Sequence, residues 1–170
     1  MDPFAKARAG ADALVARLGE KPLVMGILNV TPDSFSDGGK FLAVSAAESH
    51  FGAMAAAGAG LIDIGAESTR PGFLPVGEED EWARLEPVLR RVLASGGPPV
   101  SVDTTKAGVA RRAAALGAAM INDVSGLRAD PAMAEVAAES GAALVVMHHC
   151  ADIDPARDIA ADMLSFFDLT

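Results

Sequence analysis

Short, unbroken apolar runs alternate along this chain with alanine-rich stretches of helical spacing. The runs are rich in Val, Ile and Leu and occupy Leu23–Leu28, Leu61–Gly65, Pro99–Val102, Ala118–Ile121 and Ala142–Met147. Runs without polar alternation are typical of strands buried on both faces. The helical stretches between them cover Val44–Ala57, Glu78–Ala94, Lys106–Leu116 and Pro131–Ser140. Strands that alternate with helices of this length predict βαβ units and a parallel α/β sheet.

Charge and glycine mark the ends of these helices. The acidic run from Glu78 to Glu81 lies where a helix start favours negative charge. Asp130 followed by Pro131 predicts an N-cap and a first helical turn. Glycines follow the helical stretches at the positions where a helix stop is expected, namely Gly58, Gly96, Gly117 and Gly141.

Each of the five predicted strands ends in polar side chains. These are Asn29 after the first run, the Glu67–Gly72 segment after the second, Asp103 after the third, Asn122 and Asp123 after the fourth, and His148 and His149 after the fifth. In parallel α/β folds the ligand binds at that end of the sheet. A polar residue at a single strand end is explained simply by the exposure of that end to solvent. Five in succession, with Asn, Asp and Arg among them, favour a shared binding site.

Composition restricts the function classes. The 170 residues suffice for one domain with a core, and 23 Asp plus Glu outnumber 14 Lys plus Arg, giving a net charge of -9. An acidic chain lacks the cationic face that nucleic acids and anionic membranes require. The one cysteine excludes an internal disulfide framework and a Cys-rich zinc site. The N-terminal stretch is amphipathic and charged, without a targeting or transmembrane segment, so we expect a soluble cytoplasmic protein.

Four segments resemble the signatures of a known enzyme family. They are MGILNVTPDSFSDGG at 25–39, ESTRPG at 67–72, SVDT at 101–104 and INDVSGL at 121–127. In this order they look like successive motifs of dihydropteroate synthase. The resemblance implies a pterin-binding TIM barrel and a transferase of folate biosynthesis. Such an enzyme joins 6-hydroxymethyl-7,8-dihydropterin diphosphate to 4-aminobenzoate and releases pyrophosphate.

The resemblance also implies which residues bind the pterin. Asp103 and Asn122 match the pterin-binding aspartate and asparagine of the family. A carboxylate accepts paired N–H donors from the aminopyrimidinone edge of a pterin, and an amide can read a donor beside an acceptor. The alternative is that both side chains merely cap their strand ends.

Three further positions match contacts to the diphosphate and the metal. By resemblance, Asn29 helps to hold Mg²⁺ and the diphosphate, and Thr69 and Arg70 contact the substrate assembly. Mg²⁺ takes few protein ligands, and Arg binds oxyanions bidentately. A surface ion pair is the alternative role of Arg70. Since the aminobenzoate nitrogen captures the pterin methylene carbon directly, no protein nucleophile is needed, and we assign none.

Two long Gly/Pro/Ser-rich connections, 31–40 and 68–76, predict mobile lids. By resemblance they form the aminobenzoate pocket, with Phe35 and Pro71 as walls, and sulfonamides compete there. The alternative for Phe35 is simple anchoring of its loop. The resemblance further implies a homodimeric enzyme.

The segment after the fifth run departs from the family pattern. Met147 and His148 match, whereas Cys150-Ala151 does not. Adjacent histidines point apart along an extended chain, so we do not predict that His148 and His149 chelate one metal ion. The contacts of this loop therefore stay open.

The length is short for the implied fold. A TIM barrel needs eight strands and about 250 residues, whereas five strands and an amphipathic helix at 159–167 are predicted here. The DPG segment, seventh-strand lysine and Arg-x-His site of the family do not occur in the 170 residues. We therefore expect residues 1–170 to be the N-terminal part of a single barrel domain, truncated after about five β/α units and inactive alone.

Two alternatives remain. The first is a half-barrel that assembles with another copy or chain, including a non-catalytic pterin-binding module. The second is a different pterin-binding barrel, such as a methyltetrahydrofolate-dependent methyltransferase. The NVTPDSFSDGG and ESTRPG segments disfavour the second, because they belong to the synthase pattern.

Overall fold

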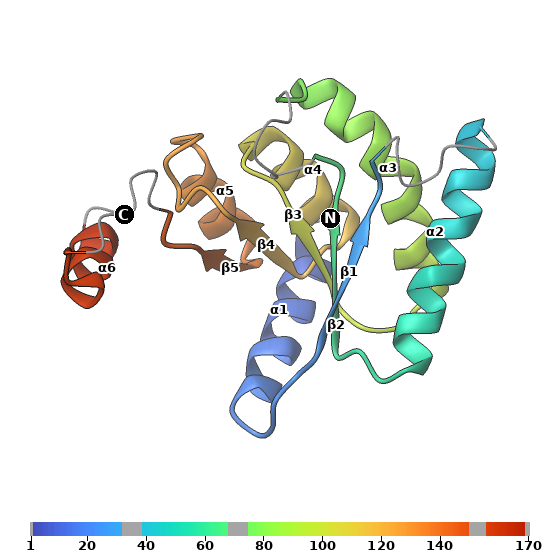
Figure 1. Cartoon of the computed structure of the whole chain (residues 1–170). Coiled ribbons are helices and arrows are strands. Elements are labelled where there is room, and N and C mark those ends of the chain that lie inside the picture. Colours follow the sequence, from blue (N-terminus) through green and yellow to red (C-terminus); the bar gives the residue numbers. More distant parts are fainter. Residues whose placement is uncertain (1, 32–38, 68–74, 150–155, 169–170) are drawn as a thin grey trace.

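Five parallel strands lie side by side in one sheet in the computed structural model (Figure 1). They are β1 (Met25–Asn29), β2 (Leu61–Gly65), β3 (Val100–Asp103), β4 (Met120–Asp123) and β5 (Ala143–Val146), paired in this order. The structure describes residues 2–31, 39–67, 75–149 and 156–168, with the backbone alone for 39–43. The predicted parallel α/β fold is confirmed, and β1 and β5 are the outer strands of the described sheet.

Helices connect the strands and cover one face of the sheet (Figure 1). They are α2 (Gly39–Ala56), α3 (Glu78–Ser95), α4 (Ala107–Leu116) and α5 (Met133–Ser140), with α6 (Ile159–Asp168) following β5. The main core packs α2, α3 and α4 onto β1 to β3 through residues such as Leu28, Ile64 and Leu89. A smaller core packs α4 and α5 onto β4. None of the described helices is long and apolar enough to cross a membrane.

A further helix, α1 (Ala5–Leu18), packs against the amino ends of the strands. Its Leu14 is fully buried against Leu61 and Met120, the first residues of β2 and β4. The sequence pattern shows an amphipathic stretch here without predicting a helix. Because α1 covers the amino ends, the carboxyl ends are left to hold a site.

The strands continue further into polar sequence than hydropathy predicts. β1 and β3 end one residue later than expected, at Asn29 and Asp103, and β4 ends two residues later, at Asp123. The apolar pattern stops where polar side chains begin, whereas the backbone hydrogen bonds of a parallel ladder do not depend on the side chain. The candidate site residues Asn29, Asp103 and Asn122 therefore belong to the strands themselves, which hold them rigidly.

The turn before α5 also differs from its prediction. The helix begins at Met133, two residues after the expected start. Asp130 is used in the preceding turn instead: its Oδ1 accepts the Ala132 N–H at 3.0 Å, and its Oδ2 accepts the Ala107 N–H at 2.9 Å. One carboxylate thus joins the starts of two neighbouring helices. The predicted glycine stops are confirmed at Gly117 and Gly141, which end α4 and α5 with φ of 115° and 65°.

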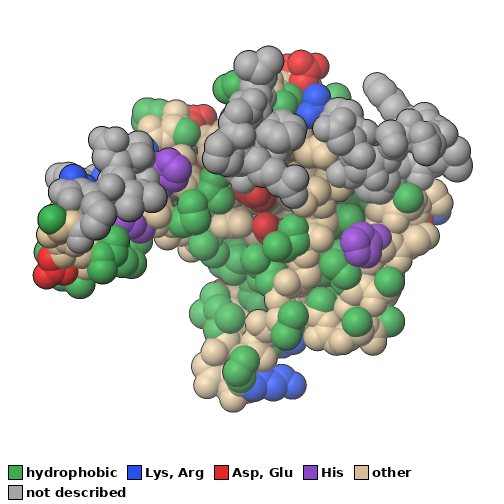
Figure 2. Space-filling view, in the orientation of Figure 1, with side chains coloured by type: hydrophobic (Ala, Val, Ile, Leu, Met, Phe, Trp, Pro, Cys, Tyr) green, Lys and Arg blue, Asp and Glu red, His purple; other side chains and the backbone are tan. Residues whose placement is uncertain are grey.

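The face of the sheet opposite the helices carries the alternate residues of each strand. At both outer strands this inner face is apolar and open: Ile27 on β1 is 60% exposed and Val145 on β5 is 39% exposed. Figure 2 shows hydrophobic side chains in the middle of the visible face and acidic side chains directly above them. The inner face therefore combines an apolar surface with a polar edge.

Candidate functional site

One row of residues crosses the carboxyl end of the sheet on its inner face. Asn29 of β1 pairs in register with Gly65 of β2, and Gly65 pairs with Asp103 of β3. Asp103 in turn pairs with Asn122 of β4. Since neighbouring strands lie about 4.8 Å apart, the fold brings Asn29, Asp103 and Asn122 together at one edge.

The side chain of Asp103 lies directly beside Gly65 in this row. A methyl group on Gly65 would lie 3.3 Å from both Cβ and Oδ2 of Asp103, which is a tight contact. Gly65 therefore leaves the space that the carboxylate occupies. Within the part of the chain that the structure describes, no donor bonds to either oxygen of Asp103. Its carboxylate is partly exposed and free to accept hydrogen bonds from a ligand.

The surroundings of Asp103 disfavour its negative charge. Burial first, and then the charges of Asp63, Glu81, Glu67 and Asp123, raise the pKa of this carboxyl from 3.8 to about 7. A hydrogen-bond donor or a positive charge supplied by a ligand would relieve this penalty. The described residues around Asp103 are thus acidic and suited to bind a ligand edge rich in N–H donors.

This raised pKa predicts an unusual dependence of stability on pH. Between pH 3.8 and about 7 the folded chain holds a proton on Asp103 that the unfolded chain has released. The free energy of unfolding should therefore fall as the pH rises through this window. Urea unfolding at pH 5 and pH 8 checks this, because Asp103→Asn should remove that part of the fall. An identical pH dependence in the two proteins would contradict it.

Asn122 is oriented by a residue that sequence reasoning missed. Its Nδ2 donates to Oδ2 of Asp63 on β2 at 3.0 Å, so its amide oxygen is left for a ligand. Asp63 is 5% exposed, and its Oδ1 has no partner among the described residues. A carboxylate in the middle of the apolar run LIDIG was the available signal, since buried charges are rare without a role.

Asp123 lies beside Asn122 in the sequence but has a different role. It is fully buried and accepts hydrogen bonds from the Ser125 N–H, the Ser125 hydroxyl and the Leu127 N–H at 2.7–2.9 Å. These bonds stabilise a turn in which Leu127 adopts a φ of 63°. Of the two polar residues that end β4, only Asn122 faces the site.

The remaining predicted positions divide into three groups. Asn29 is exposed at the end of β1. His148 is engaged, because its Nε2 lies 3.0 Å from Oδ2 of Asp162 on α6, while His149 is exposed. Outside the described residues lie Phe35, Thr69, Arg70, Pro71 and Cys150. Over the described ranges, no three His, Cys, Asp or Glu side chains are grouped to hold a metal ion.

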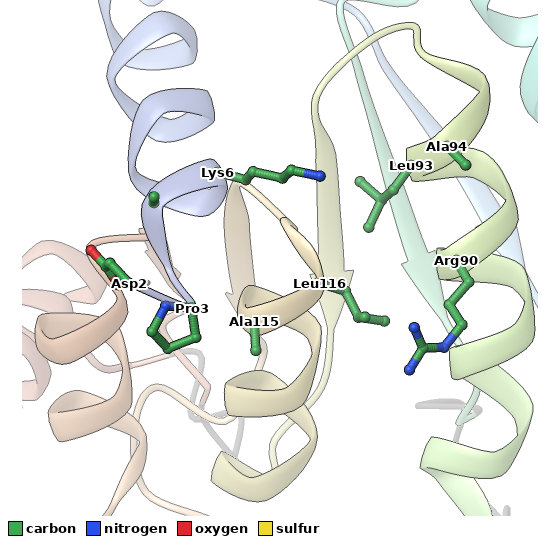
Figure 3. A pocket seen from close by; sticks show the side chains of 9 residues that line it. Asp2, Pro3, Lys6, Arg90, Leu93, Ala94, Ala115 and Leu116 are labelled. Atoms are coloured by element: carbon green, nitrogen blue, oxygen red, sulfur yellow. The ribbon is translucent and has the colours of Figure 1, made fainter.

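A groove of about 620 Å³ opens elsewhere, between α1 and the helices α3 and α4 (Figure 3). Apolar side chains, among them Leu93 and Leu116, line most of it, with Lys6 and Arg90 from facing helices. Arg90 is bonded to Glu86 of its own helix. Its lining residues on α3 and α4 lie in the last two turns of these helices, which precede the amino ends of β3 and β4. We therefore take the row of Asn29, Gly65, Asp103 and Asn122 as the candidate functional site.

Comparison with known proteins identifies a match over most of the chain. A family model described as pterin binding enzyme matches residues 25–169. The dihydropteroate synthase of Bacillus subtilis is 51% identical over 146 residues, which cover 86% of this chain and 51% of that protein. The chain thus spans about half the length of this relative.

Solved structures agree in fold. The dihydropteroate synthase of Clostridium difficile, determined in the presence of pteroic acid, superposes with a TM-score of 0.84 at 43% identity, covering 89% of this chain and 57% of that one. The Xanthomonas albilineans enzyme with 4-aminobenzoic acid gives a TM-score of 0.80 at 46% identity, covering 88% and 55%. The five parallel β/α units described here therefore correspond in fold to part of these dihydropteroate synthase structures.

Proposed function

The chain belongs to the family of pterin-binding enzymes, and we propose that it acts as part of a dihydropteroate synthase. In this role its five β/α units are one portion of a single barrel domain. The complete enzyme condenses 6-hydroxymethyl-7,8-dihydropterin diphosphate with 4-aminobenzoate to dihydropteroate and pyrophosphate. About half of the relative's length is covered, so other parts of a barrel complete the site.

The observation that carries this proposal is the carboxylate of Asp103, which receives no hydrogen bond from the described residues, beside the oriented amide of Asn122. Asp103 accepts two N–H donors of the aminopyrimidinone edge in a paired, charge-assisted geometry. Asn122 presents its amide oxygen because Asp63 holds its Nδ2. Strand ends hold these groups, so little conformational freedom is lost when the pterin binds.

The reaction needs positioning rather than a protein nucleophile. The bond between the pterin methylene carbon and the diphosphate oxygen breaks, and the electron pair leaves with pyrophosphate. The amino nitrogen of aminobenzoate forms the new bond to that carbon and then loses a proton to water. The acidic side chains around Asp103 stabilise the cationic pterin methylene during this step.

Asn29 fits the Mg²⁺ site that the family resemblance implies. Its exposed amide offers an oxygen ligand at the end of the row, and Mg²⁺ prefers oxygen ligands and retains several waters. When bound, Mg²⁺ would neutralise the leaving diphosphate. Asn29 would hold the ion together with that diphosphate.

The two connections 31–40 and 68–76, most of whose residues lie outside the described ranges, complete the proposed site. In the complete enzyme, Thr69 and Arg70 contact the substrate anions, and Phe35 and Pro71 form walls for aminobenzoate and for competing sulfonamides. A cytoplasmic homodimer is the proposed form of the enzyme.

A second function, pterin binding without catalysis, is favoured by one observation. The apolar inner face is open at both outer strands, with Ile27 60% exposed. A half-barrel that docks another chain on this face would still present Asp103 and Asn122.

Two measurements decide between these functions. The chain itself should bind 6-hydroxymethyl-7,8-dihydropterin in a calorimetric titration. A chimaera, in which the complete chain replaces the matching half of the Bacillus subtilis enzyme, should make dihydropteroate and release pyrophosphate in equal amounts. A folded chimaera that binds pterin but releases no pyrophosphate would favour the non-catalytic module. Absence of pterin binding in both proteins would overturn the proposed function.

A further inference from the structure

Three charged side chains form a largely buried bridge, and the two carboxylates among them act on the charge of Asp103. Lys106 Nζ lies 2.5 Å from Glu67 Oε2 and 2.6 Å from Glu81 Oε2. Glu67 follows β2, Glu81 is in the first turn of α3, and Lys106 precedes α4. We call this set the Glu67–Lys106–Glu81 bridge. It connects three separate segments at the carboxyl end of the sheet.

The bridge also holds both ends of the β2–α3 connection. The second carboxylate oxygen of Glu67, Oε1, accepts the N–H of Val76 at 2.8 Å. Glu67 stands at the start of this connection, and Val76 lies just before α3. Nearby, Arg84 of α3 donates to the carbonyl oxygen of Ala66 at 3.2 Å. The position of Glu67 therefore sets the distance between the two ends.

Lys106 is the group that positions Glu67. Burial acts to lower the pKa of Lys106, but hydrogen bonds to Glu67 and Glu81, together with their charges, outweigh it and raise that pKa above 10.5. The ammonium is therefore charged throughout the neutral range. Glu81 is fully buried, and its side chain anchors the ammonium to α3.

This arrangement is poorly explained by stability alone. Glu81 Oε1 is buried and has no hydrogen-bond partner among the described residues. A buried ion pair of this kind can often be replaced by apolar side chains of similar volume without loss of stability. What an apolar pair could not do is hold the carboxylate of Glu67 at one place.

We propose that Lys106 is a positioning residue of the synthase, which holds the two ends of the β2–α3 connection, through Glu67 and Glu81, in a fixed place beside Asp103. The inference rests on the proposed function. Because the proposed function makes that connection part of the 4-aminobenzoate site, the loss of Lys106 should affect this substrate. Pterin affinity, which depends on the strand residues Asp103 and Asn122, stays the same.

The deciding variant is the double replacement Lys106→Met with Glu81→Leu. It removes the charges of Lys106 and Glu81 together, so the chain should still fold. The carboxylate of Glu67 then has no ammonium group to fix its position. In the chimaera at pH 8, where Asp103 is mostly ionised with or without the charge of Glu81, KM for 4-aminobenzoate should rise about tenfold, with pterin affinity changed less than twofold. Amide hydrogen exchange of Val76 in the chain itself should also quicken about tenfold. The single variant Lys106→Arg keeps the charge and should retain a KM for 4-aminobenzoate and a rate of Val76 exchange close to those of the wild type.

Arg112→Met provides the matched control. Arg112 of α4 also contacts two carboxylates of the first turn of α3, Glu78 at 2.5 Å and Glu79 at 2.6 Å, but on the outer surface. Its loss should leave KM and Val76 exchange unchanged.

The positioning role would be overturned by a double variant that folds and has the wild-type KM for 4-aminobenzoate and the wild-type rate of Val76 exchange. Faster Val76 exchange with an unchanged KM would also overturn it. Failure of the wild-type chimaera to turn over contradicts the proposed function instead. In that case Val76 exchange in the chain still decides whether the bridge holds the connection.

Discussion

Asp103→Asn should lower the affinity of the chain for 6-hydroxymethyl-7,8-dihydropterin by about 100-fold or more. The amide has one acceptor oxygen and no charge, so the paired, charge-assisted contact to two N–H donors is lost. Hydrogen bonds to charged groups contribute about 1.5–3 kcal/mol each, and two of them correspond to a factor of this size. Isothermal titration at pH 8, where Asp103 is mostly ionised, measures the change.

The same substitution should not destabilise the fold. Burial and four neighbouring carboxylates disfavour the Asp103 charge, so the neutral amide should raise the free energy of unfolding at pH 8. A loss of binding together with a gain in stability separates a ligand-binding group from a structural one. Asp12→Asn, on the exposed side of α1, is the control for charge and should change neither quantity. Pterin affinity within threefold of wild type in Asp103→Asn would remove Asp103 from the site.

Asp123→Ala, in contrast, should lower the free energy of unfolding of the chain. It removes a fully buried carboxylate that accepts hydrogen bonds from two backbone N–H groups and one hydroxyl in a partly buried turn. Leaving such groups unpaired costs about 1–3 kcal/mol each, so a total of roughly 3 kcal/mol or more is expected. Urea unfolding measures this loss, and the melting temperature should fall by about 6–12 °C for a domain of this size.

Asn122→Ala is the comparison for this prediction. It removes one hydrogen bond, to Asp63, and should cost about 1 kcal/mol of stability while weakening pterin binding. Two adjacent residues on one strand thus separate into a binding residue and a structural one. Equal losses of stability in the two variants would show that this division is wrong.

Hydropathy predicted the strands well because parallel strands are continuous apolar runs, but β1 and β5 are not buried on both faces as expected, since the inner face of each is open in the described structure. β2 matches its predicted bounds, Leu61–Gly65, while β1, β3 and β4 extend into polar residues. Family motifs indicated Asp103 and Asn122 as site residues, and the register of the strands brings them side by side. What local pattern could not show is that Asn122 is bonded to Asp63, because these two residues are 59 positions apart in the sequence.

Glu81 illustrates this limit. In the sequence it belongs to an acidic run at a helix start and resembles its neighbours Glu78 and Glu79. In the structure those two pair with Arg112 at the surface, whereas Glu81 is fully buried against Lys106. Helical periodicity gives the direction of a side chain, but only packing against another element determines its partner.

The sequence by itself determined the parallel α/β architecture, the polar strand ends and the family. These follow from local periodicity and from motifs that are contiguous in the chain. Only the tertiary structure decided that Asp103 receives no hydrogen bond from the described residues, that Asp63 orients Asn122, and that the carboxylate of Asp123 is fully buried in a turn. The physical reason is that burial and strand register, which bring together residues as distant as Asp63 and Asn122, 59 positions apart, determine whether a carboxylate is available to a ligand or already bonded.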